Sequence, residues 1–323
     1  MSEIRLRDWQ ALATHKAVKW FIETKADRHF LINAAPGAGK TICASVIAKR
    51  LLDAGEIGRV IVIAPRTEVV RQWADEYKYV TGRPMMKVTG ADADVSDYGI
   101  DVCATWAAIS SLQEPFQAMC QEFSTLVICD EHHHAAIEAA WGDGATDAFH
   151  DAKYVLILSG TPVRSDGGET AWLLYDEQGK IDHPDDGTYN LTYGQAVQLN
   201  YCRPITFHRH EGRFSVKIAD DEEIEVCGTE DIKLDGNLKS IKGLQQALDY
   251  WKLVCTPKYK SDGITPDPAS YQGTMLQWGI AKLDDLRETM PGAGGLVIAP
   301  SIPVAEYMAE LLEELGPRLI TTT

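Results

Sequence analysis

Short apolar runs rich in β-branched residues recur along the first half of the chain, and stretches with apolar positions three or four residues apart separate them. The runs predict strands, and the wider spacing predicts helices. Strands are expected at 30–33, 60–64, 101–104, 126–129 and 154–158, and helices at 68–79 and 115–122. Apolar strands that alternate with helices indicate a parallel sheet covered on both faces, which is an α/β doubly wound domain. Its ligand site should lie at the carboxyl ends of the strands.

The periodicity breaks near residue 165, where glycines and acidic residues accumulate. We therefore expect a first domain over 1–165, an acidic region over 166–290 that includes remaining elements of that domain, and the start of a second domain over 291–323. Further strands are expected at 204–209, 213–219 and 295–300, and further helices at 238–255, 272–290 and about 303–315. The segment 291–323 is too short to bury a core of its own.

The composition indicates a soluble globular protein, because 45% of the 323 residues are hydrophobic and no apolar run approaches the roughly 20 residues of a membrane span. The N-terminus lacks the apolar segment of a secretory signal. The seven cysteines are scattered and show no Cys-x-x-Cys spacing, which favours reduced packing residues over a disulfide or a structural zinc site. We expect a cytoplasmic protein with no membrane partner.

The net charge of −16 argues against a protein that binds nucleic acid by bulk electrostatics. Residues 1–165 hold 17 Lys and Arg against 21 Asp and Glu, whereas residues 166–323 hold 14 against 26. The acidic excess therefore belongs to the second half, and the more balanced first half is compatible with a nucleic-acid surface.

A glycine-rich turn follows the strand expected at 30–33. It consists of Ala34, Ala35, Pro36, Gly37, Ala38, Gly39, Lys40 and Thr41. The run is typical of a phosphate-binding loop, except that Ala34 stands where the general pattern has glycine. Successive backbone N–H groups at the start of the following helix can bind phosphate oxygens, Lys40 can reach the terminal phosphates, and the Thr41 hydroxyl can ligate Mg²⁺. The turn predicts a nucleoside triphosphate site.

Two acidic residues, Asp130 and Glu131, follow the strand expected at 126–129. A phosphate-loop enzyme needs a carboxylate that holds Mg²⁺ through water and a base that orients the attacking water, and we assign these roles to Asp130 and Glu131 in that order. The histidines that follow project in different directions, which disfavours a shared metal ion. We interpret His133 as a coupling residue beside the phosphates.

The strand expected at 154–158 ends in Ser159, Gly160, Thr161 and Pro162. Small hydroxyl residues on either side of a glycine fit a tight turn near a charged site. Ser159 and Thr161 are expected to hydrogen-bond to Asp130, to Glu131 or to a phosphate, and so to couple the nucleotide to the rest of the domain.

This ordered set resembles the superfamily 2 helicases and translocases, in the branch with a second motif Asp-Glu-x-His that includes type III restriction subunits and DEAD/DEAH-box-like motors, phage-encoded members among them. The resemblance covers nearly the whole chain. The matching segments are 6–10 for the upstream adenine-reading element, 35–41 for motif I, 64–67 with Gln72 and Trp73 for motif Ia, 104–106 for motif Ib, 130–133 for motif II, 159–162 for motif III and 297–301 for motif IV.

The resemblance implies a RecA-like ATP-binding domain followed by an incomplete second RecA-like domain, with ATP and Mg²⁺ as cofactors. It implies that Gln10 contacts the adenine edge, that Arg7 lies near the nucleotide, and that Arg66 and Thr105 contact the nucleic-acid backbone without reading sequence. DNA is favoured over RNA. Because family members continue through motifs V and VI, the resemblance also implies a chain truncated after motif IV, with a partner chain as a possible source of the missing motifs.

Three functions stay open on the sequence. The favoured one is the motor half of an ATP-dependent DNA helicase or translocase, whose activity as an isolated chain is expected to be slow. The second is a module that binds ATP and nucleic acid without effective turnover and is completed by a partner chain. The third is a small-molecule phosphotransferase, which Gln10 and the acidic pair Asp130 and Glu131 disfavour.

Overall fold

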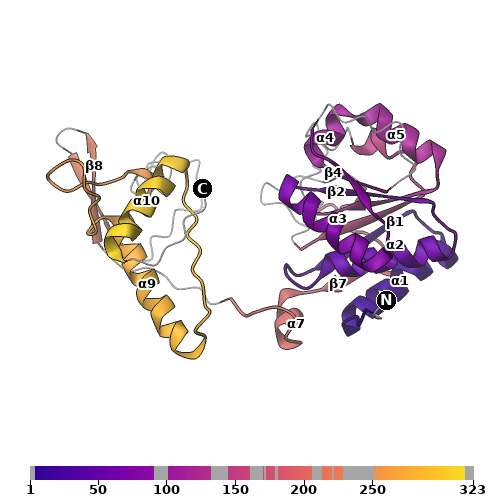
Figure 1. Cartoon of the computed structure of the whole chain (residues 1–323), viewed down its shortest axis with the longest axis horizontal. Coiled ribbons are helices and arrows are strands. Elements are labelled where there is room, and N and C mark those ends of the chain that lie inside the picture. Colours follow the sequence, from indigo (N-terminus) through magenta and orange to yellow (C-terminus); the bar gives the residue numbers. More distant parts are fainter. Residues whose placement is uncertain are drawn as a thin grey trace. The chain divides into compact units, whose positions relative to one another are not determined.

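The computed structural model describes residues 4–90, 101–131, 145–160, 170, 172–178, 181–205, 213–219, 222–227, 251–252 and 254–316. The chain divides into two compact units, Met1–Ile205 and Thr206–Thr323. Figure 1 shows the helices and strands of both units. No helix among the described residues is long and apolar enough to cross a membrane.

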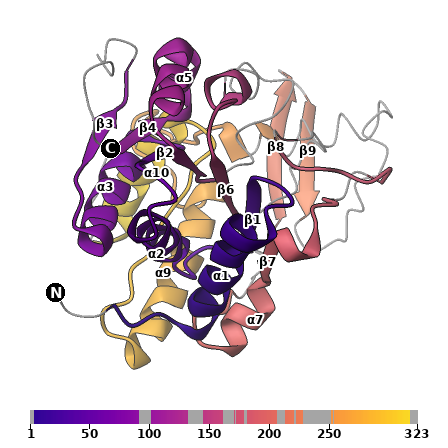
Figure 2. The same ribbon diagram turned by 90° about the vertical axis from the view of Figure 1, so that its right-hand side faces the viewer.

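The first unit is built on a sheet whose seven described strands are all parallel (Figures 1 and 2). The strands are β1 (His29–Ala34), β2 (Arg59–Ala64), β3 (Met85–Val88), β4 (Asp101–Thr105), β5 (Thr125–Cys129), β6 (Tyr154–Ser159) and β7 (Thr188–Leu191). Their order in the sheet is β3-β4-β2-β5-β6-β1-β7. The predicted α/β domain with a parallel sheet is therefore confirmed.

Helices cover both faces of this sheet. They are α1 (Asp8–Lys19), α2 (Lys40–Asp53), α3 (Thr67–Thr81), α4 (Trp106–Ser111), α5 (Gln113–Glu122) and α7 (Tyr193–Gln198), with a π-helical turn at Trp20–Thr24 and a 3₁₀ turn at Asp185–Gly187. Successive side chains of β5 alternate between two cores: Leu126 and Ile128 pack with α1, α2 and α3, whereas Val127 and Cys129 pack with α4 and α5. This period of two places one layer of helices on each face.

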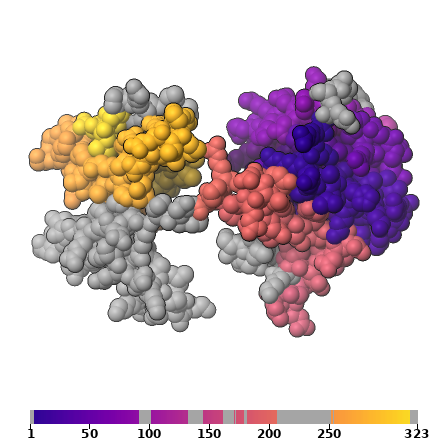
Figure 3. Space-filling view, turned by 90° about the horizontal axis from the view of Figure 1, so that it is seen from below, coloured from indigo at the N-terminus to yellow at the C-terminus, as the bar shows by residue number. Residues whose placement is uncertain are grey.

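Two strands of the sheet, β3 and β7, have no counterpart among the predicted strands. Both are edge strands of four residues with two buried positions each, so their apolar signal is weak. β7 pairs with β1, and the first compact unit runs to Ile205 instead of ending near residue 165. β7 and α7 are thus elements of the first domain that lie within the predicted 166–290 region. The space-filling view shows residues of the β7–α7 segment against residues of α1 (Figure 3). The ring centroids of Trp9 in α1 and Tyr189 in β7 are 6.1 Å apart.

The second unit contains an antiparallel pair, β8 (Arg213–Ala219) and β9 (Glu222–Cys227), and the helices α9 (Tyr271–Thr289) and α10 (Ile302–Leu315). A small apolar core joins the two helices through Leu276 of α9 and Tyr307 and Leu311 of α10. The strand predicted at 213–219 and the helices predicted at 272–290 and 303–315 are confirmed. Most of the helix predicted at 238–255, and residues 206–209 of the strand predicted at 204–209, lie outside the described residues.

The strand predicted at 295–300 is wrong for this structure. The segment is not part of a sheet, and the side chains of Leu296 and Ile298 are 86% and 84% exposed. A strand needs a neighbour for its backbone hydrogen bonds, and within the described part of the second unit no strand pairs with this segment. Its apolar pattern alone therefore does not make it a strand.

Candidate functional site

Three of the predicted motifs meet at the carboxyl edge of the sheet. The glycine-rich loop follows β1, the acidic pair follows β5, and Ser159 and Gly160 lie at the end of β6. β6 lies between β1 and β5 in the sheet, so the three strand ends are neighbours. The candidate site is thus assembled by the order of the strands, with β6 at its centre.

The loop between β1 and α2 has the backbone that a phosphate-binding turn requires. Gly37 and Gly39 have φ angles of +77° and +98°, a region that favours glycine, and α2 begins directly afterwards at Lys40. The amide of Ala38 donates to the carbonyl of Ala35 at 3.2 Å, which closes the turn. A tight turn that leads into the N-terminus of a 14-residue helix presents N–H groups to an anion. The loop therefore fits a phosphate group.

Side-chain donors hold the loop by its carbonyl oxygens. Arg7 Nη1 and Trp9 Nε1 both donate to the Ala38 carbonyl, at 2.7 and 3.3 Å. Lys40 Nζ donates to the Ala34 carbonyl at 3.2 Å, and the Cys202 thiol donates to the Pro36 carbonyl at 3.1 Å. These bonds neutralise part of the negative charge on the backbone carbonyl oxygens of the loop. The electrostatic potential at the loop is then set mainly by its backbone N–H groups, which favour an anion.

Gln10 reaches the loop, but its amide is engaged with the protein itself. Its Nε2 donates to the Gly39 carbonyl at 2.9 Å, its Oε1 accepts the Arg7 amide at 2.9 Å, and the residue is only 4% exposed. The Arg7 guanidinium lies 5.1 Å from the Tyr201 ring centroid. In this structure Gln10 and Arg7 fasten the start of α1 to the loop, and their predicted contacts with a nucleotide stay predictions.

The acidic pair lies at the end of β5, beside the loop. Asp130 is 8% exposed, and burial raises the pKa of its carboxyl. Trp73 Nε1 donates to Asp130 Oδ2 at 2.7 Å, and the Glu131 amide donates to Oδ1 at 3.1 Å. Glu131 has a φ of +48°, which turns the chain sharply after the strand. Its Oε1 lies 3.9 Å from Lys40 Nζ, so the structure brings the loop lysine and the second carboxylate together.

The end of β6 packs directly against the loop. A Cβ on Gly160 would lie 2.9 Å from Pro36 Cδ and 3.1 Å from the Ala34 carbonyl oxygen, so only glycine allows this approach. Ser159 is 1% exposed and pairs with Asn33 in the register of β1 and β6. The two other predicted coupling residues, His133 and Thr161, lie outside the described residues.

The two predicted nucleic-acid contacts are N-cap residues: Arg66 lies between β2 and α3, and Thr105 is the last residue of β4 and the N-cap of α4. Arg66 is exposed. Thr105 is 6% exposed, and its hydroxyl accepts the Ala108 amide at 3.2 Å, so it caps α4. Thr41 lies in the first turn of α2, as the predicted Mg²⁺ ligand requires. The structure therefore offers Arg66 to solvent, whereas the Thr105 hydroxyl is already used within the protein.

The structure also shows contacts that sequence reasoning missed. Trp73 belongs to motif Ia and Trp106 to motif Ib by resemblance, yet nothing in the sequence indicates that both indoles donate to Asp130, Trp106 to its backbone carbonyl at 3.3 Å. The sequence around Trp9 likewise does not indicate that its indole N–H donates to the Ala38 carbonyl of the loop. A tryptophan in an amphipathic helix has the same pattern whether its N–H faces the core or a site.

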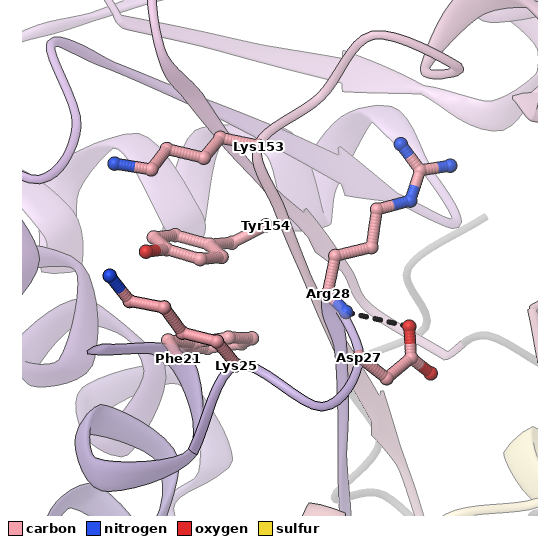
Figure 4. Close-up of a pocket in the computed structure, with 6 residues that line it drawn as sticks. All are labelled: Phe21, Lys25, Asp27, Arg28, Lys153 and Tyr154. Atoms are coloured by element: carbon pink, nitrogen blue, oxygen red, sulfur yellow. Dashed lines mark hydrogen bonds between the residues drawn. The ribbon is translucent and has the colours of Figure 1, made fainter. Parts of the chain in front are cut away.

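A separate pocket of about 260 Å³ lies at the opposite, amino-terminal edge of the sheet (Figure 4). It is lined by Phe21, Lys25, Asp27, Arg28, Lys153 and Tyr154. Lys153 is paired with Glu56 at 2.7 Å, and Arg28 donates to the Ala152 carbonyl at 3.0 Å, so these two cations already have partners within the protein. The pocket plays no part in the candidate site.

The chain is similar to a known protein family and to several known proteins. The family model described as "Type III restriction enzyme, res subunit" matches residues 3–164. The uncharacterized protein Rv2917 of Mycobacterium tuberculosis (strain ATCC 25618 / H37Rv) is 28% identical over 309 residues, which are 95% of this chain and 47% of that protein. The chain thus spans about half the length of these curated relatives.

Two further similarities are more limited. The ATP-dependent RNA helicase DHX58 of Mus musculus is 28% identical over 119 residues, which are 33% of this chain and 17% of that protein. Among solved structures, a nuclease-deletion mutant of the type ISP restriction-modification enzyme LlaGI in complex with a DNA substrate mimic has a TM-score of 0.46 at 15% identity, over 97% of this chain and 29% of that one.

Proposed function

Because the chain belongs to the family of the res subunit of type III restriction enzymes and carries a superfamily 2 helicase-like motor module, we propose that it binds ATP·Mg²⁺ at the carboxyl edge of its sheet and hydrolyses ATP in response to nucleic acid. The observation that carries this proposal is the meeting of the loop with the acidic pair: Lys40 Nζ lies 3.9 Å from Glu131 Oε1. A lysine on a phosphate-binding turn beside adjacent carboxylates is the set of groups that phosphoryl transfer to water needs.

Each group has a role that follows from its place. The N–H groups between Gly37 and Thr41 bind phosphate oxygens, and Lys40 neutralises the charge of the terminal phosphates. The Thr41 hydroxyl and the Asp130 carboxylate hold the magnesium ion. Glu131, which is 31% exposed in its side chain, accepts a proton from the attacking water and orients it. Bound ATP·Mg²⁺ would supply the phosphoanhydride bond whose hydrolysis drives the module.

The nucleic-acid part of the proposal rests on Arg66 and on the names of relatives. Arg66 is an exposed cation at the start of α3, suited to a backbone phosphate. One similar protein is named an RNA helicase, and one similar structure holds a DNA substrate mimic. We propose DNA as the preferred partner, contacted without sequence specificity, and translocation along it as the activity.

A binding experiment tests the nucleotide site first. Thermal unfolding of the chain with and without ATP·Mg²⁺ is compared for the wild type and Lys40→Ala. Ligand at about 100 times its dissociation constant should stabilise the wild type by about 2.7 kcal/mol. Lys40→Ala should lose most of this gain, because the phosphates lose their cation. An equal ATP-induced shift in both proteins would remove the basis of the assignment.

Hydrolysis is tested with Glu131→Gln, which keeps the shape of the side chain and removes the base. The variant should bind ATP·Mg²⁺ like the wild type and hydrolyse it about 10²–10⁴ times more slowly in the presence of single-stranded DNA. A wild type that binds ATP but matches Glu131→Gln in turnover would favour the second candidate function, a module that binds without effective hydrolysis. A non-hydrolysing wild type that phosphorylates a small molecule would point to the third.

A further inference from the structure

We propose that Trp73 and Trp106 are positioning residues for the magnesium-binding carboxylate: their indole N–H groups hold Asp130 from the two faces of the sheet and set the direction of its free lone pairs. The inference rests on the proposed function, in which Asp130 holds the ion. It adds two residues to the site, both outside the loop and the acidic pair.

The two indoles approach Asp130 from opposite sides. Trp73 lies on α3 and packs in the core on one face of the sheet, whereas Trp106 lies on α4 and packs in the core on the other. Both residues are 1% exposed. Trp73 Nε1 donates to the side-chain Oδ2 at 2.7 Å, and Trp106 Nε1 donates to the main-chain carbonyl at 3.3 Å. One indole thus orients the carboxylate, and the other orients the backbone that carries it.

The order of the strands makes this arrangement possible. α3 follows β2, the neighbour of β5, and α4 follows β4, the next strand out, so both helices begin within two strands of the end of β5. The Asp130 amide completes the hold by donating to the Ile63 carbonyl of β2 at 2.8 Å. Asp130 is therefore restrained at its amide, its carbonyl and both carboxylate oxygens, which leaves its side chain little rotational freedom.

The restraint leaves room for a metal ion. A carboxylate has about four lone-pair sites, and within the described residues Oδ1 accepts the Glu131 amide and Oδ2 accepts the Trp73 indole N–H. Lone pairs therefore stay available on both oxygens. Magnesium demands near-ideal octahedral geometry with short oxygen distances. A carboxylate whose direction is fixed in advance loses less freedom when it binds the ion, and so binds it more tightly.

The contact from Trp73 differs from the one that Trp106 makes, because its acceptor is a carboxylate oxygen. An N–H that donates to a carboxylate is a charge-assisted hydrogen bond and is stronger than a bond between neutral groups. A buried indole needs an acceptor in any case, so the experiment must separate the N–H group from the packing of the ring.

The test measures the magnesium requirement of ATP binding with four variants of the full chain, two at Trp73, one at Trp106 and a control at Trp20. Trp73→Phe removes the N–H group and part of the ring. Replacement of Trp73 by β-(3-benzothienyl)alanine keeps the shape of the ring and removes only the N–H. Trp20→Phe is the matched control, because Trp20 is 4% exposed and donates its indole N–H to the His29 carbonyl at 2.8 Å, at the opposite end of β1.

The readout is the Mg²⁺ concentration at which ATP-induced thermal stabilisation is half complete, with Mn²⁺ binding by electron paramagnetic resonance in the presence of ATP as a second measurement. Both Trp73 variants should need about tenfold more metal, as expected for the loss of one charge-assisted bond. ATP binding without metal should not change. Trp106→Phe should shift the midpoint in the same direction by a smaller factor, because its acceptor is a neutral carbonyl.

The outcomes separate this inference from the proposed function. A wild type with no magnesium-dependent response to ATP would overturn both. A normal wild-type response, with the midpoint of the benzothienyl variant within twofold of it, would overturn this inference alone. The same holds if Trp20→Phe shifts the midpoint as much as Trp73→Phe, since the effect would then reflect general destabilisation. If Trp73→Phe fails to fold, the benzothienyl variant decides.

Discussion

Replacing Gly39 by alanine should destabilise the first unit more than replacing Gly37, although both glycines lie in the same loop. Both have positive φ angles, +98° and +77°. A Cβ at Gly37 would meet nothing within 4 Å, whereas a Cβ at Gly39 would lie 2.8 Å from Gln10 Nε2. Gly37→Ala therefore measures the backbone strain alone, and Gly39→Ala measures the strain together with the contact between the loop and Gln10.

The expected magnitudes follow from these contacts. The left-handed backbone costs an L-residue about 1–2 kcal/mol, and the lower entropy of the unfolded alanine chain offsets about 0.4–1 kcal/mol, so Gly37→Ala should lower the free energy of unfolding by about 1 kcal/mol. The Cβ at Gly39 must also displace the Gln10 amide, which makes two hydrogen bonds of 2.9 Å. Each is worth about 0.5–1.5 kcal/mol, which brings Gly39→Ala to about 2–4 kcal/mol.

The assay is thermal unfolding of the chain without nucleotide. One kcal/mol corresponds to roughly 2–4 °C in Tm for a unit of about 200 residues. Repeating Gly39→Ala in a Gln10→Ala background completes a double-mutant cycle, and there its cost should fall to that of Gly37→Ala. Equal losses for the two glycines, or a cost at Gly39 that persists after Gln10 is shortened, would refute the reasoning.

Two further predictions concern buried charges away from the loop. Asp101 is fully buried and accepts hydrogen bonds from Tyr77 and Arg83. Asp101→Asn should therefore lower the free energy of unfolding by about 3–5 kcal/mol, as measured by urea titration. A loss under about 1 kcal/mol would contradict this expectation. Burial lowers the pKa of His29 below 6.5 and outweighs the attraction of Asp27. The unfolded chain therefore binds the proton more readily, and the free energy of unfolding should rise with pH from the lowered pKa to about 6.5. His29→Gln should flatten this slope in unfolding measurements at a series of pH values. An unchanged slope would show that other groups cause it.

Much of the candidate site can be predicted from the sequence, because its parts are local. A turn with glycines before a helix, and two acids after a buried strand, are formed by residues that are neighbours in the chain. The five central strands could be predicted for the same reason, since each is a short apolar run. The short edge strands β3 and β7 could not, because half of their positions are not buried and the pattern fades.

The order of residues along the chain is enough to identify the strand ends that form the candidate site, from the loop after β1 to Asp130 after β5. The contacts that hold these strand ends in place depend on the packing of distant elements. The order of the strands places β6 between β1 and β5 and lets Gly160 touch the loop. Helices from both faces bring the indoles of Trp73 and Trp106 to one aspartate, and α1 brings Gln10 to the loop. These contacts join residues far apart in the chain, and no local pattern records which donor a distant acceptor will meet.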